Sequence, residues 1–188
     1  MRKIGFTTSR SPAKKTRSFV HDIIRVVPHA QRIVRGSSKL LLCLKGMQNR
    51  GFNTAVVIHS VKGNPNFLRI FDLEKEPIEV PYAVKLRGST LSREYQKKQS
   101  YRRISSSILI SSLNNPEEEK IIKRILGITE ENIEDLEDKN YVTVYTDYLD
   151  KEEGIIHVEF LDKNNMQIGP RLKMKIVPRK PEDLVESS

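Results

Sequence analysis

The residues best suited to chemistry are concentrated near the start of the chain, in KIGFTTSRSPAKKTRSFVHDI (residues 3–23). Hydroxyl side chains and cations crowd this segment, as in loops that hold phosphate groups. It has no glycine after Gly5 and no Gly-Lys-Ser/Thr sequence, so a Walker-type nucleotide loop is not supported. The dinucleotide sequence G-x-G-x-x-G is absent as well. The segment therefore indicates a binding surface for a large anion and not a pocket for a nucleotide.

Catalytic and metal-binding motifs are missing elsewhere. The four histidines are scattered at positions 21, 29, 59 and 157, without an H-E-x-x-H or C-x-x-C arrangement or a G-x-S-x-G elbow. The acids cluster at 117–119, 130–138 and 150–153, which is typical of helix N-terminal turns and solvated loops. We therefore expect no enzyme activity, cofactor, metal or small-molecule substrate.

Charge is distributed very unevenly along the chain. The net charge is +9, but residues 1–106 hold 22 Lys and Arg against 6 Asp and Glu, whereas residues 107–188 hold 11 against 18. The first fifty residues contain 12 cations and a single acid, Asp22. So large an excess of positive charge favours the binding of a polyanion, and nucleic acid is the commonest polyanion in the cytoplasm.

The single cysteine, Cys43, cannot form an internal disulfide and indicates a reducing, cytoplasmic compartment. Its apolar surroundings, LLLCL, predict a small buried side chain without a reactive role. No apolar run approaches the ~18 residues that span a bilayer, and no signal-peptide pattern opens the chain, so we expect no membrane partner.

Hydrophobic patterning predicts an α/β fold. A strand over 3–8 should lead into a helix capped by Ser11, with Pro12 as its first residue. A short strand (30–36), a helix capped by Ser37 or Ser38 with an apolar face through Leu41, a hairpin (54–73) and a strand (80–88) follow.

The later part of the chain starts with a basic connector at 93–106 and a strand at 108–112. Asn115, Pro116 and Glu118 predict a capping box that opens a helix ended by Gly127. A short acidic helix within 130–138 and three strands follow, and residues 181–188 should be frayed.

An internal repeat is visible when GFTTSRSP (5–12) is set over LISSLNNP (109–116), an offset of 104 residues. Both stretches contain a strand, paired hydroxyls and a proline at the start of a helix. We therefore predict one domain (1–180) of two similar halves, 1–92 and 107–180, joined by the basic connector.

Four stretches follow one another along the chain in this order: FTTSRSPAKKTRSFVHDI, VPHAQRIVRG, VKGNPNFLRIFDL and IGPRLKMKIV. Together they resemble the Brix domain over roughly residues 1–178, in its short archaeal form, similar to the small-subunit processome member of that group. The long charged extensions of eukaryotic members are almost absent.

The resemblance implies a ribosome biogenesis factor that binds pre-rRNA and assists rRNA processing and subunit assembly, with ribosomal or assembly proteins as partners. It also implies two pseudo-symmetric halves, each a small mixed sheet with helices that resembles the anticodon-binding domains of class IIa aminoacyl-tRNA synthetases. A tRNA-binding accessory module and a protein–protein scaffold remain as alternatives.

The RNA contacts are predicted from charge and position, because the family supplies no catalytic residues. Ser11 could cap the helix or donate to a phosphate, and Tyr95 and Tyr101 could stack on bases or simply pack. The predicted RNA-binding residues are Ser9, Arg10, Lys14, Lys15, Arg17, Arg32, Arg35, Lys85, Arg87, Arg93, Lys97, Lys98, Arg102, Arg103, Arg171 and Lys173.

Overall fold

The structure, a computed structural model, describes residues 2–95, 104–130, 132–136 and 140–179. Its strands are β1 (Ile4–Thr8), β2 (Ala30–Arg32), β3 (Thr54–Val61), β4 (Asn64–Asp72), β5 (Ile78–Thr90), β6 (Ser106–Ser111), β7 (Tyr141–Asp150), β8 (Ile155–Leu161) and β9 (Arg171–Pro178). Its helices are α1 (Lys14–Val26), α2 (Leu40–Asn49) and α3 (Pro116–Leu126), with 3-10 turns η1 (Ser92–Glu94) and η2 (Ile133–Leu136). The predicted α/β class is confirmed.

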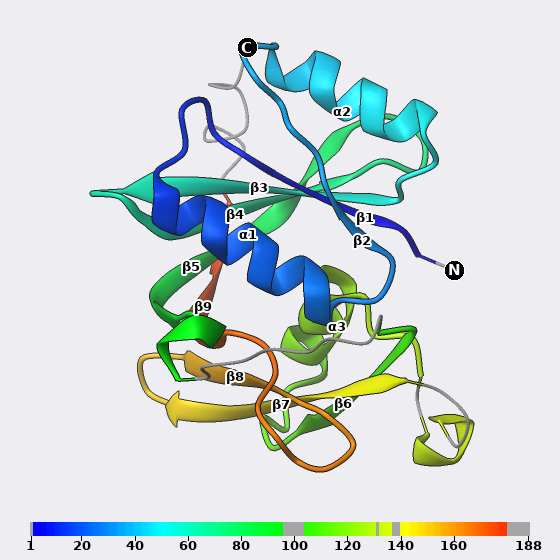
Figure 1. The fold of residues 1–188 in the computed structure, drawn as a ribbon, viewed down its shortest axis with the longest axis vertical. Helices are drawn as coiled ribbons and strands as arrows, with labels where there is room; N and C mark the ends of the chain where they lie inside the picture. The colour runs from blue at the N-terminus through cyan, green and yellow to red at the C-terminus, as the bar shows by residue number, and fades with distance from the viewer. Residues whose placement is uncertain (1, 96–103, 131, 137–139, 180–188) are drawn as a thin grey trace.

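All nine strands belong to one mixed, curled sheet in the order β2-β1-β3-β4-β5-β9-β8-β7-β6 (Figure 1). Strand β1 runs parallel to β2 and β3, and β6 runs parallel to β7, whereas all other neighbours are antiparallel. The pairing of β5 with β9 joins the early strands to the late ones. The strand predicted over 30–36 is shorter than expected, since β2 ends at Arg32.

The β3–β4 hairpin forms where the sequence KGNP predicts it. Lys62 and Gly63 have φ angles of 48° and 81°. Two consecutive left-handed residues are typical of the tight turns that match the twist of a hairpin, and glycine adopts this conformation without strain. The turn thereby fixes the register of two central strands.

Helix α1 buries the apolar face that its spacing predicts, with Phe19, Val20 and Ile23 in the core. Its predicted start is wrong. The N-cap is Ala13, which has no side-chain acceptor to offer, and Pro12 precedes the helix. Ser11 has a left-handed φ of 52°, whereas an N-cap residue is normally extended, so its hydroxyl does not close the helix.

Helix α2 also departs from its predicted start. Its N-cap is Lys39, and neither Ser37 nor Ser38 caps it. Leu40, Leu44 and Met47 form the buried face, but Leu41 is 53% exposed, so its assignment to the apolar face is wrong.

Helix α3 begins and ends as predicted. The side chain of Asn115 accepts a hydrogen bond from the Glu118 backbone N–H at 3.3 Å, Pro116 is the first residue, and Gly127 ends the helix with φ 60°. In a complete capping box, the Glu118 carboxylate would also accept a hydrogen bond from the Asn115 backbone N–H. Here this carboxylate accepts a hydrogen bond from the Tyr148 hydroxyl instead.

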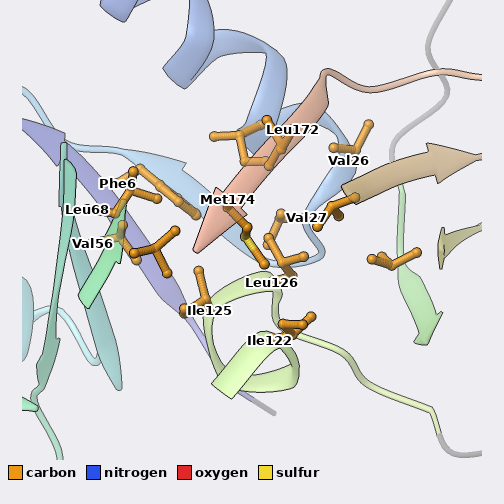
Figure 2. Packing of buried hydrophobic residues seen from close by; sticks show 14 of the residues in the cluster. Phe6, Val26, Val27, Val56, Leu68, Ile122, Ile125, Leu126, Leu172 and Met174 are labelled. Atoms are coloured by element: carbon orange, nitrogen blue, oxygen red, sulfur yellow. The ribbon is translucent and has the colours of Figure 1, made fainter. Parts of the chain in front are cut away.

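The main core lies between α1, α3 and one face of the sheet. Figure 2 shows Ile122 and Ile125 of α3 among Phe6 and Leu68 of the early strands and Met174 of β9. Residues from both sides of the connector thus share a single core. A second, smaller core lies beneath α2 on the opposite face, and its members are Leu40, Leu44, Met47, Phe52, Ala55, Val57, Phe71 and Leu73.

The tight packing of the segment before β9 leads to a first prediction. A Cβ added at Gly169 would lie 2.8 Å from Cβ and Cγ of Phe160, which is fully buried. Gly169→Ala should therefore lower the free energy of unfolding by about 1–3 kcal/mol. Gly46→Ala is the matched control: a Cβ there meets nothing within 4 Å in α2 and should stabilise by about 0.5–1 kcal/mol. Urea unfolding measures both, and equal stability of Gly169→Ala and the wild type would contradict the packing.

A second prediction concerns the ion pair between Asp72 at the end of β4 and Arg124 of α3. Burial raises the pKa of Asp72, but the hydrogen bond from the Glu74 N–H and the Arg124 guanidinium outweigh it, so the pKa lies below its ordinary value. A lowered pKa stabilises the fold above the unfolded-state value of about 3.9, and this stabilisation is lost as the pH falls through the folded-state pKa.

Asp72→Asn should therefore be less stable than the wild type at pH 7, and the difference should shrink towards pH 2. Urea unfolding across this pH range measures the effect. Glu76→Gln, which changes an exposed carboxylate, is the control. A stability gap for Asp72→Asn that stays constant with pH would rule out the ion pair as its origin.

Candidate nucleic-acid interface

A hollow of about 360 Å³ lies where the parallel strands β1 and β2 end. It is lined by residues 7–12, Arg17, Val20 and residues 32–37. The carboxyl ends of parallel strands are the usual place for ligands in α/β folds, because the connecting loops and helix N-termini converge there. The strand-to-helix junction singled out in the sequence thus forms one wall, and the segment after β2 forms the other.

Four arginines line this hollow: Arg10, Arg17, Arg32 and Arg35. None of them forms an ion pair with an acid in the described part of the chain. The Arg32 guanidinium donates to Nε2 of His21 at 3.0 Å, and Nε of Arg35 donates to the Ser38 carbonyl at 2.9 Å. These bonds orient the two guanidinium groups without neutralising them.

The positive charges in the hollow act on one another. Burial and then the charge of Arg10 lower the pKa of Arg35. Mutual repulsion of this kind costs stability in the free protein and is relieved when an anion enters. The hollow is therefore electrostatically suited to phosphate.

The start of α1 adds to this field. Its first turn contains Lys14, Lys15 and Arg17 and no acid, and its N-cap has no side-chain acceptor. Cations at a helix N-terminus oppose the positive end of the helix dipole, so they do not serve the helix itself. Ser9 lies in the loop just before it, with its backbone N–H bonded to the Ile58 carbonyl at 2.9 Å.

The N-terminus of α3 provides an internal comparison. Its first turn contains Glu117, Glu118 and Glu119, and Asn115 caps it. The three carboxylates compensate the positive end of the helix dipole, and the Asn115 side chain accepts a hydrogen bond from a backbone N–H of the first turn. The corresponding end of α1 lacks both kinds of compensation, which leaves its N–H groups open to an external anion.

The remaining predicted contacts fall into separate groups. Lys85 and Lys173 lie on the adjacent strands β5 and β9, and exposed Arg87 follows on β5. Exposed Arg93 lies in η1. Arg171 is partly neutralised, because its Nε lies 3.0 Å from a carboxylate oxygen of Glu159. The predicted contacts Lys97, Lys98, Arg102 and Arg103 lie outside the described residues.

Tyr95 packs in the structure. Its hydroxyl donates to the Gly169 carbonyl, and the Arg171 guanidinium lies 5.1 Å from its ring centroid. Burial raises the pKa of its hydroxyl. Of the two interpretations of this tyrosine, packing is the one that these interactions support, and Tyr101 lies outside the described residues.

The sequence reasoning overlooked several residues of this surface. Val34, Gly36 and Ser37 line the hollow, although only the neighbouring arginines were expected to contribute. Lys175 lies directly opposite Lys85 across β5 and β9. The alternation of cations along 171–175 predicts a strand with a basic face that includes Lys175, but the register of this strand with β5 depends on segments far apart in the chain.

The part of the chain that the structure describes supports neither a metal site nor a membrane-spanning helix. Among the described residues, no group of three His, Cys, Asp or Glu side chains could hold a metal ion. In the same part of the chain, no helix is both long and apolar enough to cross a membrane. Cys43 is partly buried against the second core, and burial raises the pKa of its thiol.

Comparison with known proteins agrees with this architecture. No family model matches the chain. A probable Brix domain-containing ribosomal biogenesis protein of Pyrobaculum aerophilum is 30% identical over 125 residues, which cover 66% of this chain and 68% of the relative. The Methanococcus maripaludis protein of the same name is 25% identical over 171 residues, covering 91% and 94%.

A solved structure shows the same fold. The probable ribosomal biogenesis protein from Aeropyrum pernix K1 superimposes with a TM-score of 0.79 at 23% identity, covering 96% of this chain and 98% of that one. The chain therefore belongs to the family of Brix domain-containing ribosomal biogenesis proteins, as the match to the Pyrobaculum relative shows.

The open N-terminus of α1 leads to a third prediction. Ala13 has the extended backbone of an N-cap residue, with φ −62° and ψ 158°. Ala13→Asp should therefore supply the missing acceptor and a favourable charge, and raise the free energy of unfolding by about 1 kcal/mol. Ala13→Asn adds the acceptor alone and should stabilise less at low ionic strength. Thermal or urea unfolding measures both, and a loss of stability in both variants would contradict an uncapped helix end.

Proposed function

We propose that this protein is a ribosome biogenesis factor that binds pre-rRNA at the hollow and assists rRNA processing and subunit assembly without catalysis of its own. The observation that carries the proposal is the set of four arginines around the hollow, which have no acidic partner among the described residues and stand beside the uncapped N-terminus of α1. The names of the relatives supply the ribosomal context.

The chemistry of the hollow suits an RNA backbone. Planar guanidinium groups such as those of Arg10 and Arg32 bind phosphate oxygens through two parallel N–H bonds. The N–H groups of the first turn of α1 add donors and the positive end of a dipole. Contacts of this kind read no base sequence, so they hold and position RNA rather than select it.

We further propose the cytoplasm as the place of action and ribosomal or assembly proteins as partners. The division into one domain of two pseudo-symmetric halves, each like a class IIa synthetase anticodon-binding domain, is part of this proposal. The sheet order supports it, since β1, β3, β4 and β5 follow one another from one side and β6, β7, β8 and β9 from the other.

Crosslinking in cells, followed by sequencing of the bound RNA, tests the biological target. We expect reads concentrated in pre-rRNA. Reads concentrated in tRNA would instead identify an accessory module of the tRNA apparatus, and the absence of enriched RNA would favour a protein–protein scaffold.

A binding measurement tests the site and provides a fourth prediction. Arg10→Gln combined with Arg32→Gln should weaken binding to a labelled pre-rRNA fragment about tenfold or more at low salt. The slope of log K against log salt should also become shallower by about 0.7 for each phosphate that the variant no longer binds. Lys120→Gln combined with Lys163→Gln removes the same charge from exposed positions of the other half and is the control. If both double variants weakened RNA binding equally, the hollow would be excluded as a specific RNA-binding site.

A further inference from the structure

A row of four side chains crosses the sheet in register. His59 of β3 lies opposite Phe67 of β4, Phe67 lies opposite Lys85 of β5, and Lys85 lies opposite Lys175 of β9. Residues directly opposite each other on neighbouring antiparallel strands project from the same face of a sheet. We call these four residues the Phe67 row.

The Phe67 row lies on the face away from α1 and α3. The next residues along the strands, Leu68 and Val84, point into the main core, so Phe67 and Lys85 point to the other side. On that side the core beneath α2 includes Val57 and other residues nearer the opposite end of β3 and β4. It does not include the row, which continues past the helix towards β9.

Phe67 is unusual among the phenylalanines. The other five belong to the two cores, whereas Phe67 belongs to neither and is only partly buried. The guanidinium of Arg179, which is paired with Glu79, lies over its ring at 5.6 Å from the centroid. A partly open aromatic ring with cations beside it is the usual arrangement on which proteins stack the bases of single-stranded nucleic acid.

The two lysines of the row carry like charges at directly opposed positions. Such a cross-strand pair is destabilising in the free protein. Neither Lys85 nor Lys175 has an acidic partner among the described residues. An anion lying over both lysines would compensate this repulsion, and the phosphates that flank a stacked base are such anions.

His59 links the row to the hollow. Its Nε2 is enclosed and has no hydrogen-bond partner, which is uncommon for a buried polar atom. Burial, followed by the charges of Arg69 and Arg35, lowers the pKa of His59. Arg35 lines the hollow, so the row begins within electrostatic range of the proposed phosphate grip.

We propose that the Phe67 row is a binding site for single-stranded RNA, in which an unpaired base stacks on the Phe67 ring and its flanking phosphates lie over Lys85 and Lys175. This deepens the proposed function and rests on it, because it specifies that the bound RNA is unpaired. A base inside a duplex cannot reach the ring, whereas any unpaired base offers a face for stacking.

Fluorescence of 2-aminopurine tests the stacking directly. Single-stranded RNA oligonucleotides of about 12 nucleotides, each with one 2-aminopurine at a different position, are titrated with the protein. We expect one or more positions to be quenched by the wild type and by Phe67→Tyr, which keeps the ring. Phe67→Leu keeps an apolar side chain but removes the ring, so it should lose the quenching and about tenfold or more in affinity. Affinity for duplex RNA should not change.

The lysine pair provides an independent measurement. Lys85→Gln combined with Lys175→Gln should weaken binding of the same oligonucleotides and make the salt dependence shallower. The same change should raise the melting temperature of the free protein, because it removes the opposed charges. A purely structural role for the lysines would lower the melting temperature instead and overturn this part of the proposal.

The outcomes separate this proposal from the proposed function. One outcome is that the double variant Arg10→Gln with Arg32→Gln no longer binds RNA, whereas Phe67→Leu binds RNA and quenches 2-aminopurine like the wild type. This result supports the hollow as an RNA-binding site and refutes the Phe67 row. If the wild type binds no RNA, both are refuted. Should Phe67→Leu fail to fold, the wild type and Phe67→Tyr decide the matter, since an absence of quenching at every position overturns the stacking.

Discussion

The burial of α3 against strands from the other half of the chain is the interaction on which the rest of the structure depends. Ile122 and Ile125 have no core of their own and share one with Phe6, Leu68 and the residues of α1. Each fully buried side chain of this kind contributes about 1.5–3 kcal/mol. Pairing of β5 with β9 holds the sheet continuous around this core, so neither half is independent of the other.

This constraint also determines where the two proposed RNA-binding surfaces lie. With α1 and α3 on one face, α2 is the one helix of the described chain that packs on the other, and it covers one end of that face (Figure 1). The packing of α1 also places its N-terminus beside the ends of β1 and β2. The positions of the hollow and of the sheet face that carries the Phe67 row are therefore consequences of the shared core, and both include cations that have no acidic partner among the described residues.

Local features were predictable from sequence where short-range chemistry alone determines them, as at the ends of α3 and not at the starts of α1 and α2. Asn115, Pro116 and Gly127 delimit α3 through capping and left-handed geometry. Ser11 and Pro12 have the same appearance in the sequence, but the left-handed turn at Ser11 displaces the helix start to Lys14. That turn depends on the loop after β1, and a pattern of residue types does not encode it.

Long-range features were predictable only in part. The arginines of the hollow could be predicted as candidate RNA contacts, because the clustering of cations in the first half of the chain is visible in the sequence without a structure. Phe67 was missed, and the basic strand face that includes Lys175 could not be paired with Lys85, because both depend on the register of β4, β5 and β9, strands separated by up to a hundred residues. Hydrophobic alternation predicts which face a residue occupies and says nothing about its cross-strand neighbour.

The two helix N-termini should respond differently to RNA, because that of α1 is open to a phosphate and that of α3 is capped. Nuclear magnetic resonance of the backbone amides during an RNA titration compares them directly. We expect large chemical shift changes for Lys14, Lys15 and Thr16, which lead α1, and none for Glu117, Glu118 and Glu119 in the first turn of α3. Equal changes at both helix ends, or none at α1 while RNA is bound, would contradict a phosphate grip at α1.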